Sequence, residues 1–279
     1  FYIFFSNLYE DNFVNQLFFN ETENLIFILS LCLFFSIGLI DDKNDLSSRY
    51  KIILFFFLII LYLNFDTSTI IEILFFSSIK KILLLQNAGF IFTLLCIIIF
   101  INAFNMYDGS NGQIGFYSII IIVYLSYKWQ SLELLMILLP ILIFLVLNLK
   151  SETFIGNSGS YFLGFFFSII IIKIYKLDSG YLKADEIALL MFYPIIDLIR
   201  LFIIRLVNNK NPFIGDREHI HHYLLNRFKK NFLVQIYLFS LVSFPIMIYE
   251  IFKINLAMIL IMNLILYIFT IIKTKNILK

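Results

Sequence analysis

Nine apolar segments, separated by short polar stretches, take up most of this 279-residue chain. A bilayer offers no water to the backbone, so a segment that crosses it must satisfy its own N–H and C=O groups, as an α-helix does. Crossing the hydrocarbon core takes about 20 apolar residues. Several segments are shorter and must extend into flanking polar residues or be shielded by neighbouring helices. The sequence therefore predicts an all-α fold, a polytopic helix bundle in a membrane.

We place the predicted spans where apolar residues run between polar ones. They are Leu25–Ile40, Tyr50–Phe65, Phe90–Ile101, Ile114–Tyr127, Leu132–Leu149, Tyr161–Tyr175, Ile187–Leu206, Phe232–Tyr249 and Asn255–Ile272. The stretch Asp66–Asn87 is ambiguous, because Ile71–Phe76 and Ile82–Leu85 are compatible with an interfacial helix, a hairpin or a further span. No internal repeat or linker divides the chain, which predicts a single domain over residues 1–279.

The composition supports a membrane protein and excludes other classes. Hydrophobic residues make up 61% of the chain, charged residues 14%, and the mean hydropathy is +0.92. A soluble domain carries about 25% charged residues. The net charge of +2 is too small for a nucleic-acid-binding surface, so no nucleic-acid partner is expected. Cys32 and Cys96 both lie inside apolar runs, which predicts small packing residues without a disulfide or a metal.

Four polar segments interrupt the apolar pattern, and alternating the predicted spans places all four on one side of the membrane. They are Asp41-Asp42, Asn102–Gly112, Gly156–Ser160 and Pro212–His222. The same side carries 14 of the 21 Lys and Arg residues, which makes it cytoplasmic by the positive-inside rule. Carboxylates, carboxamides, glycines and histidines gathered on one face predict an active site for a charged, phosphate-bearing substrate.

Asp41 and Asp42 end an apolar run. A carboxylate near the hydrocarbon costs a few kcal/mol unless it is paired or hydrated. The pair could serve Mg²⁺ or act as a base, and it could equally be a helix stop at the level of the lipid headgroups. Lys51 is a candidate contact for a lipid or nucleotide phosphate, although basic residues at this depth commonly just reach towards the interface.

Two of the polar segments are especially rich in side chains that bind ligands. Asn102–Gly112 contains three Asn, one Asp and two Gly, which suit close contact with a base or sugar; a re-entrant turn is the alternative. All three histidines of the chain, His219, His221 and His222, follow Asp216 and Arg217. A zinc site is one possibility, but three histidines without a nearby cysteine favour hydrogen bonding and charge donation to a diphosphate.

Together these segments resemble the polyprenyl-phosphate N-acetylhexosamine-1-phosphate transferases of the bacterial glycosyltransferase family 4. The matching pieces are Gly38-Leu-Ile-Asp-Asp42, Asn102-Ala-Phe-Asn-Met-Tyr-Asp-Gly-x-Asn-Gly112, Gly156-x-x-Gly-Ser-x-x-Leu-Gly164, Pro194-Ile-x-Asp197 and Pro212-Phe-x-x-Asp-Arg-x-His-x-His-His222. Each piece alone is weak, but five in order, with agreeing spacing and sidedness, are specific. The histidine motif resembles that of the branch that uses simple UDP-N-acetylhexosamines, and it differs from the motif of the peptidoglycan branch.

The resemblance implies an enzyme that transfers a sugar-1-phosphate from a UDP-N-acetylhexosamine to polyprenyl (undecaprenyl) phosphate. UMP is released, and the product is the first lipid-linked intermediate of a cell-envelope polysaccharide. The implied cofactor is Mg²⁺, with Mn²⁺ as the alternative. The implied location is the bacterial inner membrane, with the active site facing the cytoplasm. A homodimer is a possible assembly.

The same resemblance assigns roles to individual residues. Catalytic roles are expected for Asp41, Asp42 and Asp108, and metal ligation for Asp108 and Asn157. The expected substrate contacts are Lys51, Asn102, Asn105, Asn111, Asp216, Arg217, His219, His221 and His222. Asp197 is expected to be structural, pairing with Arg200 at the i+3 position of a helix.

The chain departs from the family pattern at two positions and at its start. Asn157 stands where the family carries an Asp that is a principal Mg²⁺ ligand; a carboxamide oxygen can still coordinate, but one negative charge is lost. Asn111 stands where many bacterial members carry Asp. The sequence begins at Phe1 without an initiator methionine, and two helices and a basic loop of the family would precede it. We therefore expect an N-terminally truncated chain, with nine spans visible of eleven.

Two alternative functions stay open. A transporter or channel would line a pathway between both membrane faces with intramembrane charges, whereas here the polar motifs stop at one face. A catalytically inactive relative is favoured by Asn157 and by the missing N-terminal helices.

Overall fold

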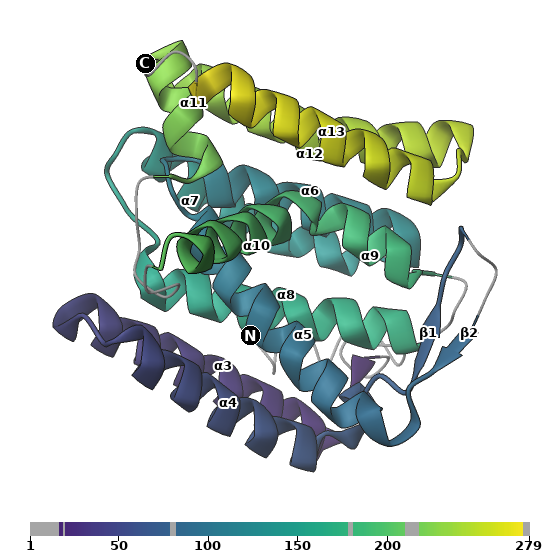
Figure 1. Ribbon diagram of the computed structural model, residues 1–279. Coiled ribbons are helices and arrows are strands. Elements are labelled where there is room, and N and C mark those ends of the chain that lie inside the picture. The colour runs from purple at the N-terminus through teal and green to yellow at the C-terminus, as the bar shows by residue number, and fades with distance from the viewer. Residues whose placement is uncertain (1–16, 19, 79–81, 178–180, 210–217, 276–279) are drawn as a thin grey trace.

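The computed structural model describes residues 17–18, 20–78, 82–177, 181–209 and 218–275, which form a layered helix bundle (Figure 1). The helices are α3 (Glu21–Asn44), α4 (Ser48–Phe65), α5 (Gly89–Tyr107), α6 (Gln113–Trp129), α7 (Leu138–Leu149), α8 (Gly156–Leu177), α9 (Ala184–Leu190), α10 (Phe192–Val207), α11 (Ile220–Phe228), α12 (Asn231–Phe252) and α13 (Leu256–Lys275). The pair α3–α4 forms one outer layer and α12–α13 the opposite one, with α5, α6, α8 and α10 between them (Figure 1). The prediction of an all-α membrane bundle is confirmed.

The predicted count of nine spans is not confirmed. Six helices in the described part of the chain are long and apolar enough to cross a membrane, and α9 with α10 makes a seventh if the bent pair counts as one span. The other two predicted spans form shorter helices. α6 has 17 residues, and α7 has 12, because its first turns are a 3₁₀ helix over Glu133–Ile137.

Helix α8 is the centre of the bundle. Of its most apolar 18-residue stretch, 78% is buried inside the bundle, compared with 22% for the outer helix α4. It packs antiparallel along α3, where the Phe34 and Phe165 rings stack with centroids 4.5 Å apart. Gly38 permits this approach, since a Cβ there would lie 2.2 Å from the Cα of Ser158. The first turn of α8 is thereby held against the end of α3 that carries the two predicted aspartates.

The ambiguous stretch between α4 and α5 is a β-hairpin. Strand β1 (Ile73–Phe75) pairs antiparallel with β2 (Ile82–Leu84) at the edge of the bundle (Figure 1). The hydroxyl of Tyr175 on α8 accepts a hydrogen bond from the Phe75 N–H and donates one to the Ile73 carbonyl, both at 2.8 Å. The hairpin therefore satisfies part of its backbone through the C-terminal end of α8.

Buried charged residues hold the bundle together at the end away from the polar motifs. Lys173 of α8 lies 2.8 Å from an Asp66 oxygen and 3.2 Å from Glu23. In a second cluster, Lys128 lies 2.8 Å from Glu186 and 3.4 Å from Glu250. Each lysine joins helices that are far apart in sequence, so this end of the bundle is closed by ion pairs as well as by apolar packing.

Candidate active site

A cavity of about 370 Å³ opens between α4, α5, α8 and α10 at the end of the bundle that carries the polar motifs. Its polar lining consists of Ser48, Lys51, Asn102, Asn105, Tyr161, Arg205 and His219. Four of these, Lys51, Asn102, Asn105 and His219, are residues that the sequence predicts as substrate contacts. The fold thus brings three separate sequence segments to one cavity.

Asp41 is fully buried beside this cavity. One carboxylate oxygen accepts a hydrogen bond from the Tyr161 hydroxyl at 2.6 Å and lies 2.7 Å from the Lys51 ammonium group. The other accepts the Leu46 N–H at 2.9 Å. The carboxylate therefore orients Lys51 and Tyr161, which themselves line the cavity, and its predicted catalytic role stays a prediction.

Asp42 caps the N-terminus of α8. Its two carboxylate oxygens accept the backbone N–H groups of Asn157 at 2.8 Å and Ser158 at 3.1 Å. These donors have no partner within the helix, and a negative charge there is favoured by the helix dipole. Gly156, with φ +64°, lets the chain pass close by, since a Cβ there would lie 2.7 Å from an Asp42 oxygen. The second aspartate thus fixes the start of the segment that contains Asn157.

The carboxamides of α5 connect to that same segment. The Ser160 hydroxyl donates to the Asn105 side-chain oxygen at 2.6 Å and lies 3.2 Å from the Asn157 carbonyl. Asn102 donates from its side chain to the Ile98 carbonyl one turn earlier on α5, at 2.8 Å. Asn105 and Asn157 therefore belong to one hydrogen-bonded network next to the cavity.

Asp108 follows the last residue of α5, where the carbonyl end of the helix is itself partly negative. Burial raises the pKa of its carboxyl group to about 7, so a nearby cation would favour the ionised form. In the described residues no group of three or more His, Cys, Asp or Glu side chains is arranged to hold a metal ion. Mg²⁺ does not require such a group, because it binds through one or two oxygen ligands, waters and substrate phosphates. Asp108 and Asn157 each carry oxygen atoms of the kind that Mg²⁺ binds, and metal ligation by these two residues stays a prediction.

The histidine segment is anchored by Asp197. His219 Nδ1 lies 3.0 Å from an Asp197 oxygen, and the Arg200 guanidinium lies 2.8 Å from the other oxygen. The Tyr267 hydroxyl donates to the same carboxylate at 2.6 Å. The predicted i+3 pair of Asp197 and Arg200 is present, and it orients the one histidine that lines the cavity.

His221 has a different environment from His219. Its ring lies against Gly109, where a Cβ would come within 1.8 Å of the imidazole. Burial, with His222 and His219 nearby, lowers the pKa of His221 to about 3. The ring is therefore neutral near pH 7 and can contribute hydrogen bonds but no charge. His222 packs beside it, with ring centroids 4.2 Å apart.

Asn111, another predicted substrate contact, is not among the residues that line the cavity. The Asn111 side chain donates to the Ser151 hydroxyl at 2.7 Å, and its carbonyl accepts a hydrogen bond from Asn231 at 2.7 Å. This residue therefore connects the α5–α6 loop with the α7–α8 loop and with the start of α12. Asp216 and Arg217 lie outside the described residues.

Tyr161 and Arg205 are cavity residues to which no motif in the sequence points. Both line the cavity, and Arg205 is 5% exposed. Tyr161 lies within the Gly156–Gly164 motif but at one of its variable positions. Arg205 lies in no polar motif and is one basic residue among many in the sequence. Only the packing of α8 and α10 around the cavity shows that these two residues belong to the site.

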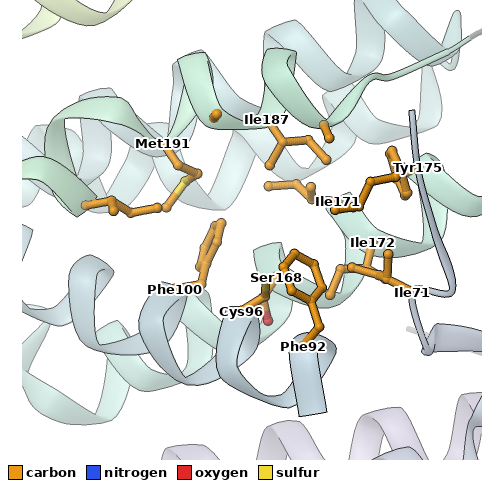
Figure 2. Close-up of a pocket in the computed structure, with 14 residues that line it drawn as sticks. Ile71, Phe92, Cys96, Phe100, Ser168, Ile171, Ile172, Tyr175, Ile187 and Met191 are labelled. Carbon is orange, nitrogen blue, oxygen red and sulfur yellow. The ribbon is translucent and has the colours of Figure 1, made fainter. Parts of the chain in front are cut away.

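A second cavity, of about 200 Å³, is almost entirely apolar. Phe92, Cys96 and Phe100 of α5 face Ile187 and Met191 across it, and Ile171 and Tyr175 of α8 close it (Figure 2). Both cavities lie along the seam between α5 and α10, since Leu198 and Phe202 line the polar one and Ile195 the apolar one. One seam therefore offers a cationic and amide-rich end and an apolar end.

This arrangement is that of a multi-pass membrane protein with a polar and an apolar cavity along one helix seam. The family model for "Glycosyl transferase family 4" matches residues 24–175, more than half of the chain, and the chain belongs to that family. The predicted family is thereby confirmed.

Curated relatives carry closely related names. The chain is 30% identical over 203 residues to the undecaprenyl-phosphate alpha-N-acetylglucosaminyl 1-phosphate transferase of Thermotoga maritima, covering 72% of this chain and 62% of that protein. It is 28% identical over 149 residues to the protein of that name from Yersinia pestis, covering 49% and 41%. It is 28% identical over 218 residues to the probable undecaprenyl-phosphate N-acetylglucosaminyl 1-phosphate transferase of Bacillus subtilis, covering 74% and 60%. The match thus spans less than two thirds of each relative's length.

Proposed function

We propose that this protein transfers a sugar-1-phosphate from a UDP-N-acetylhexosamine to a polyprenyl phosphate such as undecaprenyl phosphate. The observation that carries the proposal is the seam between α5 and α10. At one end Lys51, Arg205 and His219 line a polar cavity, and at the other end the lining is apolar. A lipid phosphate has the same two-part character, and it must meet a water-soluble donor at the polar end.

The reaction consists of a displacement at phosphorus. An oxygen of the lipid phosphate attacks the phosphorus that carries the sugar, a new P–O–P bond forms, and the bond to UMP breaks. UMP leaves with the electron pair of that bond. Catalysis of such a transfer depends on positioning and on positive charge near the phosphoryl oxygens.

The residues around the polar cavity supply both requirements. Lys51 and Arg205 offer fixed positive charge, with Lys51 held in place by Asp41. Asn102 and Asn105 offer donors and acceptors for the nucleotide or sugar. Bound Mg²⁺, or Mn²⁺, would supply further positive charge against the diphosphate, and Asp108 and Asn157 are the residues that would hold it.

The test is direct transfer. Membranes or purified full-length protein, labelled UDP-N-acetylglucosamine, undecaprenyl phosphate and Mg²⁺ should yield labelled lipid and UMP in equal amounts. Repeating the assay with other UDP-N-acetylhexosamines identifies the donor. Labelled lipid that fails to form with every donor would contradict the proposal.

We place the site on the cytoplasmic face of a bacterial inner membrane. In a background of Cys32→Ser and Cys96→Ser, an Asn226→Cys variant is expected to react with a membrane-impermeant maleimide only in inverted vesicles. Glu133→Cys, at the opposite end of the bundle, is expected to react in intact spheroplasts. Both positions are exposed. Labelling of the two cysteines from the same side would overturn the assignment.

Asn157→Asp is expected to lower the Mg²⁺ concentration for half-maximal rate by a few-fold. An added carboxylate contributes roughly 1 kcal/mol toward a partly solvated divalent ion. The new charge would also lie next to Asp42, which accepts the Asn157 N–H. The variant should therefore melt at a lower temperature without Mg²⁺ and regain that stability when the ion is added.

The exposed Asn226→Asp provides the matched control for an added charge and should change neither value. An unchanged Mg²⁺ dependence in Asn157→Asp would remove Asn157 from the metal site. An inactive native protein that gains turnover as Asn157→Asp would instead identify the chain as an inactive relative.

A further inference from the structure

The break between α9 and α10 contains a backbone carbonyl that its own helix cannot satisfy. The two helices meet at Met191 with a bend of 74°. In an unbroken helix the N–H of residue 194 would donate to the Leu190 carbonyl, but residue 194 is Pro and has no N–H. A buried carbonyl without a donor costs about 1–3 kcal/mol, so something else must supply the hydrogen bond.

Tyr117 supplies it. Its hydroxyl donates to the Leu190 carbonyl at 3.0 Å and lies 2.8 Å from the Met191 sulfur. Tyr117 belongs to α6 and is 2% exposed. Its ring is held by Tyr107 and Phe104, with centroids 5.0 and 5.6 Å away. A rigidly held hydroxyl from another helix thus takes the place of the missing N–H.

The break is also one wall of the apolar cavity. Ile187 and Ala188 of α9, Met191 at the break and Ile195 of α10 line it, facing Phe92, Cys96 and Phe100 on α5 (Figure 2). The angle at Met191 sets how far this wall stands from α5. Tyr117 is not part of the lining, so its influence on the cavity passes through Leu190 and Met191.

We infer that Tyr117 is a positioning residue for the lipid substrate, because it fixes the α9–α10 break and with it the shape of the apolar cavity. The inference rests on the proposed function in one respect, that the cavity receives part of the prenyl chain. Tyr117 touches no reacting atom, so it should affect the lipid and spare the nucleotide sugar.

Tyr117→Phe is expected to raise the KM for undecaprenyl phosphate by about three- to tenfold, the size of one lost hydrogen bond. The KM for the UDP-sugar and kcat should stay within about twofold of the native values, since the polar cavity is unchanged. Tyr124→Phe, on the same helix but with its hydroxyl near Glu250 at 3.3 Å, is the matched control and should leave the lipid KM unchanged. Equal losses for both substrates would show a merely structural role and overturn the inference.

Pro194→Ala tests the coupling. Alanine restores an N–H for the Leu190 carbonyl, so the Tyr117 hydroxyl should no longer be needed. The effect of Tyr117→Phe on the lipid KM should then shrink to less than about twofold in the Pro194→Ala background, a non-additivity that a double-mutant cycle measures directly. Fully additive effects would contradict the proposed link between Tyr117 and the break.

Cys96 gives a readout that does not need activity. The chain has two cysteines, so Cys32→Ser leaves Cys96 in the cavity lining as the single thiol. Tyr117→Phe should change the rate at which N-ethylmaleimide modifies Cys96 by at least about threefold, because the loss of one hydrogen bond alters the cavity wall. Tyr124→Phe should leave this rate unchanged. Undecaprenyl phosphate should slow the reaction in the Cys32→Ser protein.

These outcomes separate the two hypotheses. An unchanged Cys96 rate in Tyr117→Phe contradicts the positioning role whatever the activity. Absence of protection by undecaprenyl phosphate contradicts the lipid part of the inference. Absence of transfer by the native protein contradicts the proposed function alone, because the thiol rates still report the cavity.

Discussion

Asp41→Asn is expected to reduce sugar-phosphate transfer by about 10²–10³-fold, the range for losing one preorganised group that stabilises the transition state. The buried carboxylate of Asp41 fixes the Lys51 ammonium group at 2.7 Å and the Tyr161 hydroxyl at 2.6 Å. An uncharged carboxamide would release Lys51 from that position. The side-chain oxygen of Asn can still accept the Leu46 N–H, so the fold should survive. The measurement is the initial rate of lipid-linked product, with melting temperature as the check on folding.

Variants of Lys51 and of the exposed Asp45 test whether Asp41 acts by holding Lys51. Lys51→Met should lose about as much activity as Asp41→Asn, and the double variant should be little worse than either, because residues that act as a unit are non-additive. Asp45→Asn, four residues further along and exposed, should keep near-native turnover. Near-native turnover in Asp41→Asn would show that Lys51 needs no anchor. Strictly multiplicative losses in the double variant would show that the two residues act separately.

The sequence was sufficient to predict the helices and the clustering of the motifs. Apolar runs and the requirement for internal hydrogen bonds led to the α-helical bundle. Alternation of the spans brought Lys51, Asn102, Asn105 and His219 to one side, and in the structure they line one cavity. The polar segments stand out clearly from the apolar runs, so these four residues could be grouped although the predicted number of spans is not confirmed.

The predictions that failed or were missing concern contacts between residues far apart in the chain. The span predicted over Ile187–Leu206 is broken at Met191. Pro194 lies within this predicted span and can interrupt a helix. The hydroxyl group that stabilises the break, however, comes from Tyr117 on another helix. In the same way, the sequence does not distinguish the two adjacent aspartates. In the structure Asp41 is buried, whereas Asp42 caps the N-terminus of α8.

The end of the bundle away from the polar motifs contains a buried charge cluster that the sequence pattern does not reveal. Lys173 lies there with Asp66 and with Glu23, which is 150 positions away from it in sequence. In the sequence, each of these charged residues lies near the end of an apolar segment and has no evident partner. Only the antiparallel packing of α3 and α8 makes them a cluster, and periodicity carries no information about such a pairing.

Lys173→Met is therefore expected to destabilise the protein by about 3–5 kcal/mol, the usual cost of removing one partner from a buried ion pair. Lys173 is 3% exposed and Asp66 is fully buried, so methionine fills the space but leaves two carboxylates without their cation. In detergent this should lower the melting temperature by roughly 10 °C. Lys150→Met, at an exposed position on the motif side, is the control and should melt within about 2 °C of the native protein.

The pH dependence distinguishes lost charge pairing from lost packing. Burial acts to raise the pKa of Asp66, but hydrogen bonds from Lys173, Ser68 and Tyr62 outweigh it and hold that pKa below its ordinary value. A carboxyl group with a lowered pKa stabilises the native state above its unfolded pKa of about 3.9 and loses that contribution as the pH falls. In Lys173→Met the Asp66 carboxyl group loses its cation and stays buried, so its pKa should rise above the unfolded value and the loss of stability should lessen when the group is protonated. The gap in melting temperature between the native protein and the variant should narrow from pH 7 towards pH 4. A gap that stays constant over this range would mean that Lys173 contributes packing and not charge.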